Sequence, residues 1–168
     1  MKLSNELISG RIWLLGDNVD TDQIIPAKYL VTSDPDKLAM HFMENTNPDL
    51  AKSIGKGDII VAGRNFGCGS SREHAVRTIQ GCGISLVIAE SFARIFFRNS
   101  INLGLPVIEA KIEAPEGTVL NVDMEKGKIR WDSGEAEFQK YPPFLKKIVD
   151  SGSIINYAKE GLIRQKSQ

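Results

Sequence analysis

The run GDIIVAG at residues 57–63 is the strongest structural signal in the chain. Its β-branched residues between two glycines predict a buried strand. The chain continues with a helical pattern beginning near Ser70, an apolar strand over residues 84–89, a helix over residues 92–103 and a short strand over residues 107–109. Strands and helices that alternate in this way predict a parallel αβ layer, and hence an α/β protein.

The segments on either side of this layer carry weaker patterns. On the amino-terminal side we expect a strand over residues 10–16, a polar loop over residues 17–22 and short helices over residues 26–30 and 36–43. On the carboxyl-terminal side, residues 119–123 and 128–131 predict an additional β-hairpin, which residues 137–138 extend. Residues 143–149 and 154–162 are amphipathic and close the chain.

The composition is that of one globular domain spanning residues 1–168, with 42% hydrophobic and 25% charged residues. Basic and acidic residues number 21 each, so the net charge is zero. A nucleic-acid or membrane-surface binder would show a basic excess, and no stretch has the length of a transmembrane helix. Residues 1–6 lack the apolar run of a signal peptide. We therefore expect a cytoplasmic protein.

Cysteine and histidine are too scarce to predict a metal centre. Cys68 and Cys82 do not suffice for a disulfide scaffold, and an iron–sulfur cluster normally takes about three or four thiolates. His41 and His74 stand alone, without zinc-type spacing. We expect no metal or cofactor to be bound by this chain, and we interpret Cys68 as a small loop residue.

The loop that follows the first buried strand is the best candidate for a functional site. Its sequence, GRNFGCGSSREH at residues 63–74, brings two hydroxyls and a guanidinium to the start of a helix. Gly67 and Gly69 permit positive φ and a close approach of a ligand to the backbone. Free N–H groups of a first helical turn favour an anion, and Arg72 can bind a carboxylate through two hydrogen bonds. The residues therefore predict an anion site.

A purely structural interpretation of the same loop is also consistent with the spacing. Ser70 would then be the N-cap of the helix, and Glu73 would be its capping-box partner. The pattern also leaves the anion open, because a phosphate would fit a glycine-rich helix start as well as a carboxylate does.

Three segments together resemble a known family. In the right order along the chain, the sequence resembles the motifs of the swivelling domain of the aconitase superfamily at GDNVDTDQIIP (residues 16–26), NFGCGSSREH (residues 65–74) and AESFARIFFRN (residues 89–99). The resemblance covers residues 8–110 and implies a swivelling β/β/α domain. A domain of this type in a separate chain resembles the small subunits of isopropylmalate isomerases and of archaeal-type homoaconitases.

The resemblance implies a hydro-lyase that isomerises 2-isopropylmalate and 3-isopropylmalate, in leucine biosynthesis, by dehydration and rehydration. Ser70 matches the catalytic base, and Ser71, Arg72 and Gly69 match ligands of a small dicarboxylic hydroxy-acid substrate. A large partner subunit, in a heterodimer or heterotetramer, would supply a 4Fe–4S cluster. Two alternatives stay open. One is a homoaconitase or methylmalate-type dehydratase, and the other is a non-catalytic anion-binding module.

A fourth segment, Tyr29-Leu30-Val31-Thr32, resembles the specificity loop of the family. The resemblance implies that homoaconitase-like members have an arginine where Val31 stands, so that an apolar Val31 favours isopropylmalate. The alternative is that Val31 is a core residue at a helix end.

Outside these motifs, charged side chains favour structural roles. We expect Arg94 and Arg98 to be surface or supporting residues, and Asp20 and Asp22 to fix their loop rather than bind a metal.

Overall fold

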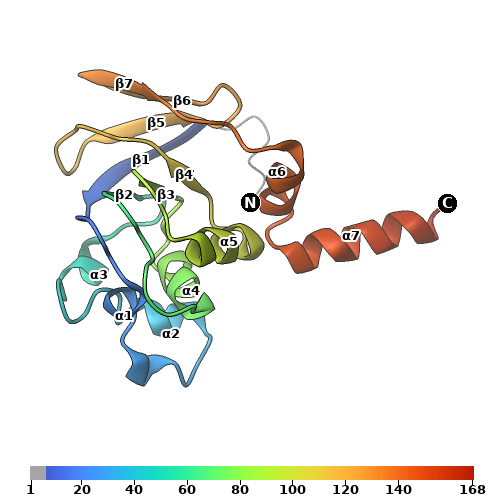
Figure 1. Ribbon diagram of the computed structural model, residues 1–168, viewed down its shortest axis with the longest axis horizontal. Helices are drawn as coiled ribbons and strands as arrows, with labels where there is room; N and C mark the ends of the chain where they lie inside the picture. Colours follow the sequence, from blue (N-terminus) through green and yellow to red (C-terminus); the bar gives the residue numbers. More distant parts are fainter. Residues whose placement is uncertain (1–6) are drawn as a thin grey trace.

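A single curled sheet organises the computed structural model, which describes residues 7–168. The segment over residues 1–6, whose sequence lacks a signal-peptide pattern, lies outside the described residues. Within the described part, seven strands pair in the order β4-β3-β2-β1-β5-β6-β7 (Figure 1). The strands are β1 (Leu7–Leu14), β2 (Ile59–Ala62), β3 (Leu86–Ala89), β4 (Val107–Glu109), β5 (Val119–Asp123), β6 (Lys128–Trp131) and β7 (Gly134–Glu137).

The parallel half of the sheet confirms the predicted αβ layer. Strands β2, β3 and β4 are parallel neighbours, and every residue of β2 and β3 is buried. Such continuous burial explains why these strands appear in the sequence as unbroken apolar runs. Strand β1 extends this layer on the other side, with Ile12 opposite Ile59. It runs over residues 7–14 rather than the predicted 10–16, because its first residues pair with β5.

The antiparallel half confirms the predicted hairpin. Strand β5 pairs with β6, with Asp123 opposite Lys128, and β7 adds to β6 as the third strand of this half. Strand β1 belongs to both halves, since it is parallel to β2 and antiparallel to β5. In Figure 1 strands β5, β6 and β7 arch away from the parallel strands, which gives the sheet its curl.

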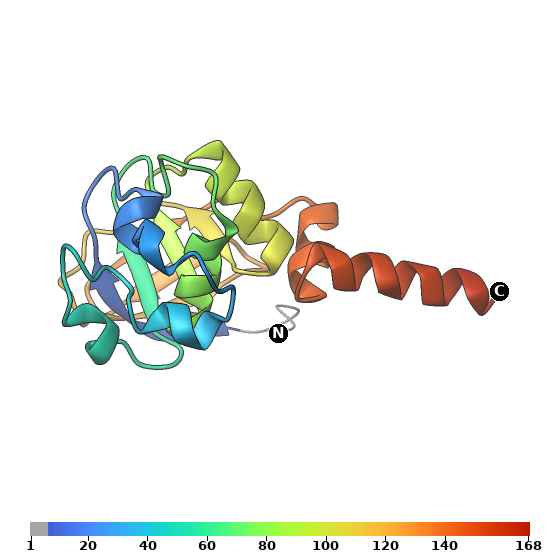
Figure 2. The ribbon, with the colours of Figure 1, turned by 90° about the horizontal axis from the view of Figure 1, so that it is seen from below.

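Helices α4 and α5 pack beside the parallel half, as Figure 1 shows, and they bury Val76, Ile79, Phe96 and Ile101. Helix α7 projects from the body, as the view in Figure 2 shows, and none of its residues is buried. The helices are α1 (Thr21–Ile24), η1 (Ala27–Tyr29, a 3-10 helix), α2 (Pro35–Ala39), α3 (Leu50–Ser53), α4 (Glu73–Gly81), α5 (Arg94–Leu103), α6 (Pro143–Asp150) and α7 (Ile154–Lys166).

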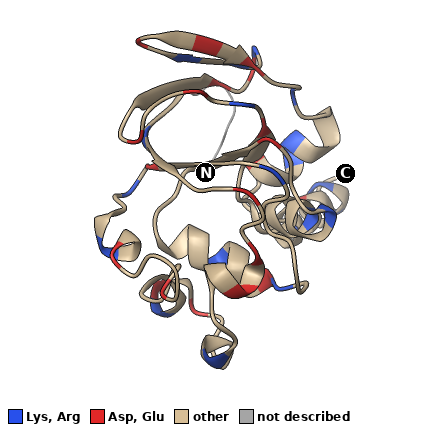
Figure 3. Ribbon diagram, turned by 60° about the vertical axis from the view of Figure 1, so that its left-hand side comes forward, with Lys and Arg blue, Asp and Glu red and all other residues tan. Residues whose placement is uncertain are grey.

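Charged residues are dispersed over the molecule. Figure 3 shows Lys and Arg lying among Asp and Glu along the strands and helices. No helix among residues 7–168 is long and apolar enough to cross a membrane.

Candidate functional site

The three motif segments lie at one edge of the sheet. Residues 16–26 follow β1, residues 63–74 follow β2, and residues 89–99 begin at the end of β3 and run into α5. These strands are adjacent and parallel, so their carboxyl ends meet at the same edge, which is where ligands bind in open α/β sheets. The topology therefore brings together segments that are far apart in the sequence.

Backbone hydrogen bonds join the first segment to the second. The Gly67 N–H donates to the Val19 carbonyl at 2.7 Å, and the Thr21 N–H donates to the Cys68 carbonyl at 2.9 Å. The Thr21 hydroxyl donates to the Ser70 carbonyl at 3.0 Å. These contacts hold the backbone of the Ser-Ser-Arg segment against the loop after β1.

A similar set of contacts joins the second segment to the third. The Phe66 N–H donates to the Ser91 carbonyl at 3.0 Å, and the Ala93 N–H donates to the Phe66 carbonyl at 2.9 Å. Gly67 has φ of +80°, and a Cβ at this position would lie 2.1 Å from Cγ of Phe96. A side chain at position 67 would therefore collide with the first turns of α5, so the segment can pack there only with a glycine.

A pocket of about 280 Å³ lies where the three segments meet. The four predicted ligand and base positions, residues 69–72, all line it. Thr21 and Asn99 line it too, and although both lie inside the motif segments, neither is among the predicted site residues. The full lining is Thr21, Gly67, Gly69, Ser70, Ser71, Arg72, Ala93, Arg94, Ile95, Phe96 and Asn99.

Ser70 and Ser71 are exposed, and within residues 7–168 neither hydroxyl has a hydrogen-bond partner. Helix α4 begins at Glu73, with Arg72 as its N-cap in an extended conformation. The predicted helix is therefore present but begins three residues after Ser70, and the interpretation of Ser70 as its N-cap with Glu73 in a capping box was wrong. The physical reason is the contact with Thr21, which keeps Ser70 in the loop, three residues before the helix.

Arg72 reaches from this loop to the first segment. Its Nη1 forms an ion pair with the Asp22 carboxylate, and its side chain is mostly buried, with 19% exposed. Asp20 is the N-cap of α1, where its side chain accepts from the Gln23 N–H at 2.8 Å. Both aspartates thus make contacts that fix the loop, as predicted. Among residues 7–168 no group of three or more His, Cys, Asp and Glu is placed to hold a metal ion.

The two arginines of the third segment differ from each other. Arg94 is exposed at the start of α5 and lines the pocket, where a surface or supporting role had been expected. Arg98 is exposed one turn further along α5 and is not part of the lining. Arg94 is therefore an additional cation beside the hydroxyls.

Both cysteines have the character of neutral thiols. Burial, and then the Asp20 carboxylate, raise the pKa of the Cys68 thiol. Burial raises the pKa of Cys82, at the end of α4, to about 12. Metal ligation and nucleophilic attack need the thiolate, which both environments disfavour.

The predicted specificity loop lies outside the pocket lining. Val31 is 93% exposed, so the interpretation of Val31 as a core residue was wrong. Tyr29, Leu30 and Thr32 are half-buried, and the Thr32 hydroxyl accepts from the Asp34 N–H at 3.1 Å. The loop therefore presents one large apolar side chain to solvent, between η1 and α2.

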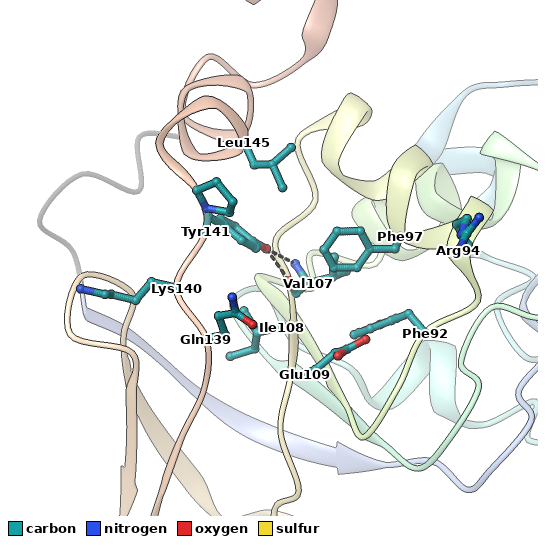
Figure 4. A pocket seen from close by; sticks show the side chains of 11 residues that line it. Phe92, Arg94, Phe97, Val107, Ile108, Glu109, Gln139, Lys140, Tyr141 and Leu145 are labelled. Carbon is teal, nitrogen blue, oxygen red and sulfur yellow. Dashed lines mark hydrogen bonds between the residues drawn. The ribbon is translucent and has the colours of Figure 1, made fainter.

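A second pocket, of about 350 Å³, lies between α5, β4 and the segment before α6 (Figure 4). Tyr141 points across it, and its hydroxyl both donates to the Val107 carbonyl and accepts from the Val107 N–H. Arg94 and Lys140 lie at its opposite ends. Since its one hydroxyl is already paired and its cations are separated, this pocket lacks the convergent polar groups of the Ser70 pocket.

Known proteins similar to this chain agree on a family. The family model of the aconitase C-terminal domain matches residues 28–113. The 3-isopropylmalate dehydratase small subunit of Aquifex aeolicus is 55% identical over 159 residues, covering 91% of this chain and 95% of that protein. The methanogen homoaconitase small subunit of Methanothermobacter thermautotrophicus is 50% identical over 153 residues, covering 90% of each.

A solved structure extends the agreement to three dimensions. The crystal structure of 3-isopropylmalate dehydratase from Methanocaldococcus jannaschii superimposes with a TM-score of 0.92 at 44% identity, covering 97% of this chain and 100% of that chain. Identity at this level over nearly the whole chain indicates common descent rather than a shared fold alone. The chain therefore belongs to the aconitase C-terminal domain family, among the small subunits of the 3-isopropylmalate dehydratase type.

Proposed function

We propose that this chain is the small subunit of a 3-isopropylmalate dehydratase, a hydro-lyase of leucine biosynthesis that works in the cytoplasm. One observation carries the proposal: Ser70, Ser71 and Arg72 line a single pocket, and both hydroxyls are exposed and unpaired within residues 7–168. The relatives support the substrate, since several are named 3-isopropylmalate dehydratase small subunits.

Ser70 is the proposed base. Its alkoxide would take the proton from the carbon next to a substrate carboxylate, and loss of the hydroxyl group would leave an alkene diacid. Return of the proton and of hydroxide, which together are one water, with the opposite regiochemistry then gives the isomer. An alkoxide needs nearby cations and N–H donors, and Arg72 and Arg94 supply the charge on this pocket. Ser71, Arg72 and the backbone at Gly69 would bind the substrate carboxylates.

The residues of this chain do not fit an iron–sulfur cluster. Cys68 and Cys82 are held as neutral thiols, and no group of metal ligands forms among residues 7–168. We therefore place the 4Fe–4S cluster in a large partner subunit, where it would act as a Lewis acid toward the leaving hydroxyl. Our proposal includes that partner, as a heterodimer or heterotetramer.

The proposal predicts that the isolated chain is colourless and inactive. Anaerobic reconstitution with iron and sulfide should give no visible absorption of a cluster, and 3-isopropylmalate should be turned over only after the large subunit is added. The test is to measure visible absorption and turnover of 3-isopropylmalate for each chain alone and for the mixture of the two chains. A cluster assembled on this chain alone, or turnover without the partner, would refute the proposal that the large subunit supplies the cluster.

Arg72→Lys should mainly raise the KM of the assembled enzyme, by about tenfold, while kcat falls less. A lysine is a point charge that cannot reproduce the planar fork of a guanidinium toward a carboxylate. Steady-state kinetics with 3-isopropylmalate measure the change. The matched control is Arg98→Lys, because Arg98 lies on α5 outside the pocket lining. An unchanged KM for Arg72→Lys would remove Arg72 from the substrate site.

A second candidate function is that of a homoaconitase small subunit, favoured by the 50% identity to the relative from Methanothermobacter thermautotrophicus. Its substrate carries a third carboxylate, which calls for a cation in the specificity loop. This chain has the exposed, apolar Val31 there, which favours the isopropyl group.

A further inference from the structure

A cluster of four side chains lies at the base of the specificity loop. Glu44 Oε1 accepts a hydrogen bond from the Tyr29 hydroxyl at 2.9 Å and lies 3.2 Å from His41 Nδ1. The rings of Tyr29 and His41 stack with their centroids 3.6 Å apart and their planes at 10°. Lys28 Nζ lies 3.9 Å from the other oxygen of Glu44. One carboxylate thus joins three side chains.

This cluster connects the two ends of one loop. Tyr29 ends η1, whereas His41 and Glu44 follow α2. The chain between them, residues 30–40, contains Val31, so the cluster closes this segment at its base. A backbone hydrogen bond from the Met43 N–H to the Ile24 carbonyl, at 3.1 Å, adds a further connection next to the cluster.

We propose that Tyr29, His41 and Glu44 are positioning residues that hold the loop so that Val31 faces the substrate's variable group. This inference rests on the proposed function, and it adds residues that never touch the substrate. A loop that is already ordered loses less conformational entropy when a substrate binds, so binding is tighter and the contact at Val31 discriminates better.

The charge states at neutral pH suit this role. The hydrogen bond from Tyr29 is the main cause that lowers the pKa of the Glu44 carboxyl, and the same bond is the main cause that raises the pKa of Tyr29. The carboxylate is therefore charged and the phenol protonated, which is the arrangement in which the hydrogen bond between them is strongest. Glu44 is two-thirds buried, so solvent competes with its partners only in part.

A merely structural role would give a different result from a positioning role. Loss of a structural contact lowers thermal stability and leaves KM and substrate preference unchanged. Loss of a positioning contact raises KM and weakens discrimination while kcat changes little, because Ser70 and Arg72 belong to other segments.

The test uses Tyr29→Phe, Glu44→Gln and the double variant in the assembled enzyme. Tyr29→Phe retains the stacked ring and loses only the hydroxyl, and Glu44→Gln retains the shape and loses the charge. We expect each single variant to raise KM for 3-isopropylmalate about five- to tenfold with kcat within about twofold, and to reduce the preference over a γ-carboxylate substrate. The double variant should add little, because Tyr29→Phe removes, and Glu44→Gln weakens, the same hydrogen bond.

Glu113→Gln is the matched control, because Glu113 is an exposed carboxylate that pairs with Lys111 outside the loop. An unchanged KM and preference in both single variants, with or without a lower melting temperature, would overturn the inference. If the wild-type enzyme turns over only a tricarboxylate, the substrate assignment fails, and the KM for that tricarboxylate then tests the positioning role. An enzyme inactive on both substrates would overturn the inference together with the proposed function.

Discussion

Ser70→Ala should lower kcat of the assembled enzyme by at least about a hundredfold, the usual contribution of a positioned proton-transfer group. KM should change far less, because Ser71 and Arg72 remain to bind the carboxylates. The fold should be unaffected, with an unfolding free energy within about 0.5 kcal/mol of wild type, since Ser70 is an exposed loop residue and not a helix cap. Steady-state kinetics and urea denaturation measure the two quantities.

Ser53→Ala provides the comparison. Ser53 is also exposed, and its hydroxyl donates to the Asp49 carbonyl at 2.9 Å on α3, outside the pocket. It should retain wild-type kcat. If Ser70→Ala retained most of its activity, the proton would have to be carried by another group, and the proposed mechanism would fail while the family assignment stood.

Val31→Arg should lower kcat/KM for 3-isopropylmalate at least about tenfold and raise it for substrates with a γ-carboxylate. Burying the three carbons of an isopropyl group against valine contributes about 2 kcal/mol, at about 0.8 kcal/mol per carbon. An arginine facing the same group would be desolvated without a partner, which costs several kcal/mol. The position is 93% exposed in the free chain, so the change should leave stability intact. Competition assays with both substrate types give the ratio directly.

Met40→Arg separates the effect of position from that of charge. Met40 is 69% exposed at the end of α2, so the variant adds the same cation to the same region of the surface. It should leave the substrate ratio within about twofold of wild type. A wild-type preference for the tricarboxylate, or an unchanged ratio in Val31→Arg, would refute the assignment to leucine biosynthesis and leave the hydro-lyase proposal standing.

The sequence predicted the parallel layer because that layer follows from local patterns. Strands β2 and β3 are buried on both sides, and strands in that environment are continuous apolar runs in the sequence. Once the strands are parallel neighbours, the segments after them must share an edge. The hairpin was equally predictable from its turn.

The start of α4 could not be predicted in this way. Ser70 remains in the loop because Thr21, 49 residues earlier, donates a hydrogen bond to its carbonyl. A contact between residues so far apart in sequence cannot be predicted from local helix propensity. Helix α1 is a different case, because Asp20 and Gln23 form a capping box whose spacing is visible in the sequence. His41 stands alone in the sequence for a similar reason, because its stacking partner Tyr29 is brought next to it only by the fold.

The projecting helix α7 has a consequence for the colloidal behaviour of the free chain. Ile155, Leu162 and Ile163 are each more than half exposed on a helix without buried residues. The chain has zero net charge at pH 7 and a pI of about 6.7, so long-range repulsion does not keep two molecules apart near neutrality. Attraction between apolar side chains then acts without an electrostatic barrier, and solubility should be lowest near neutral pH and improve as the pH moves away from the pI in either direction.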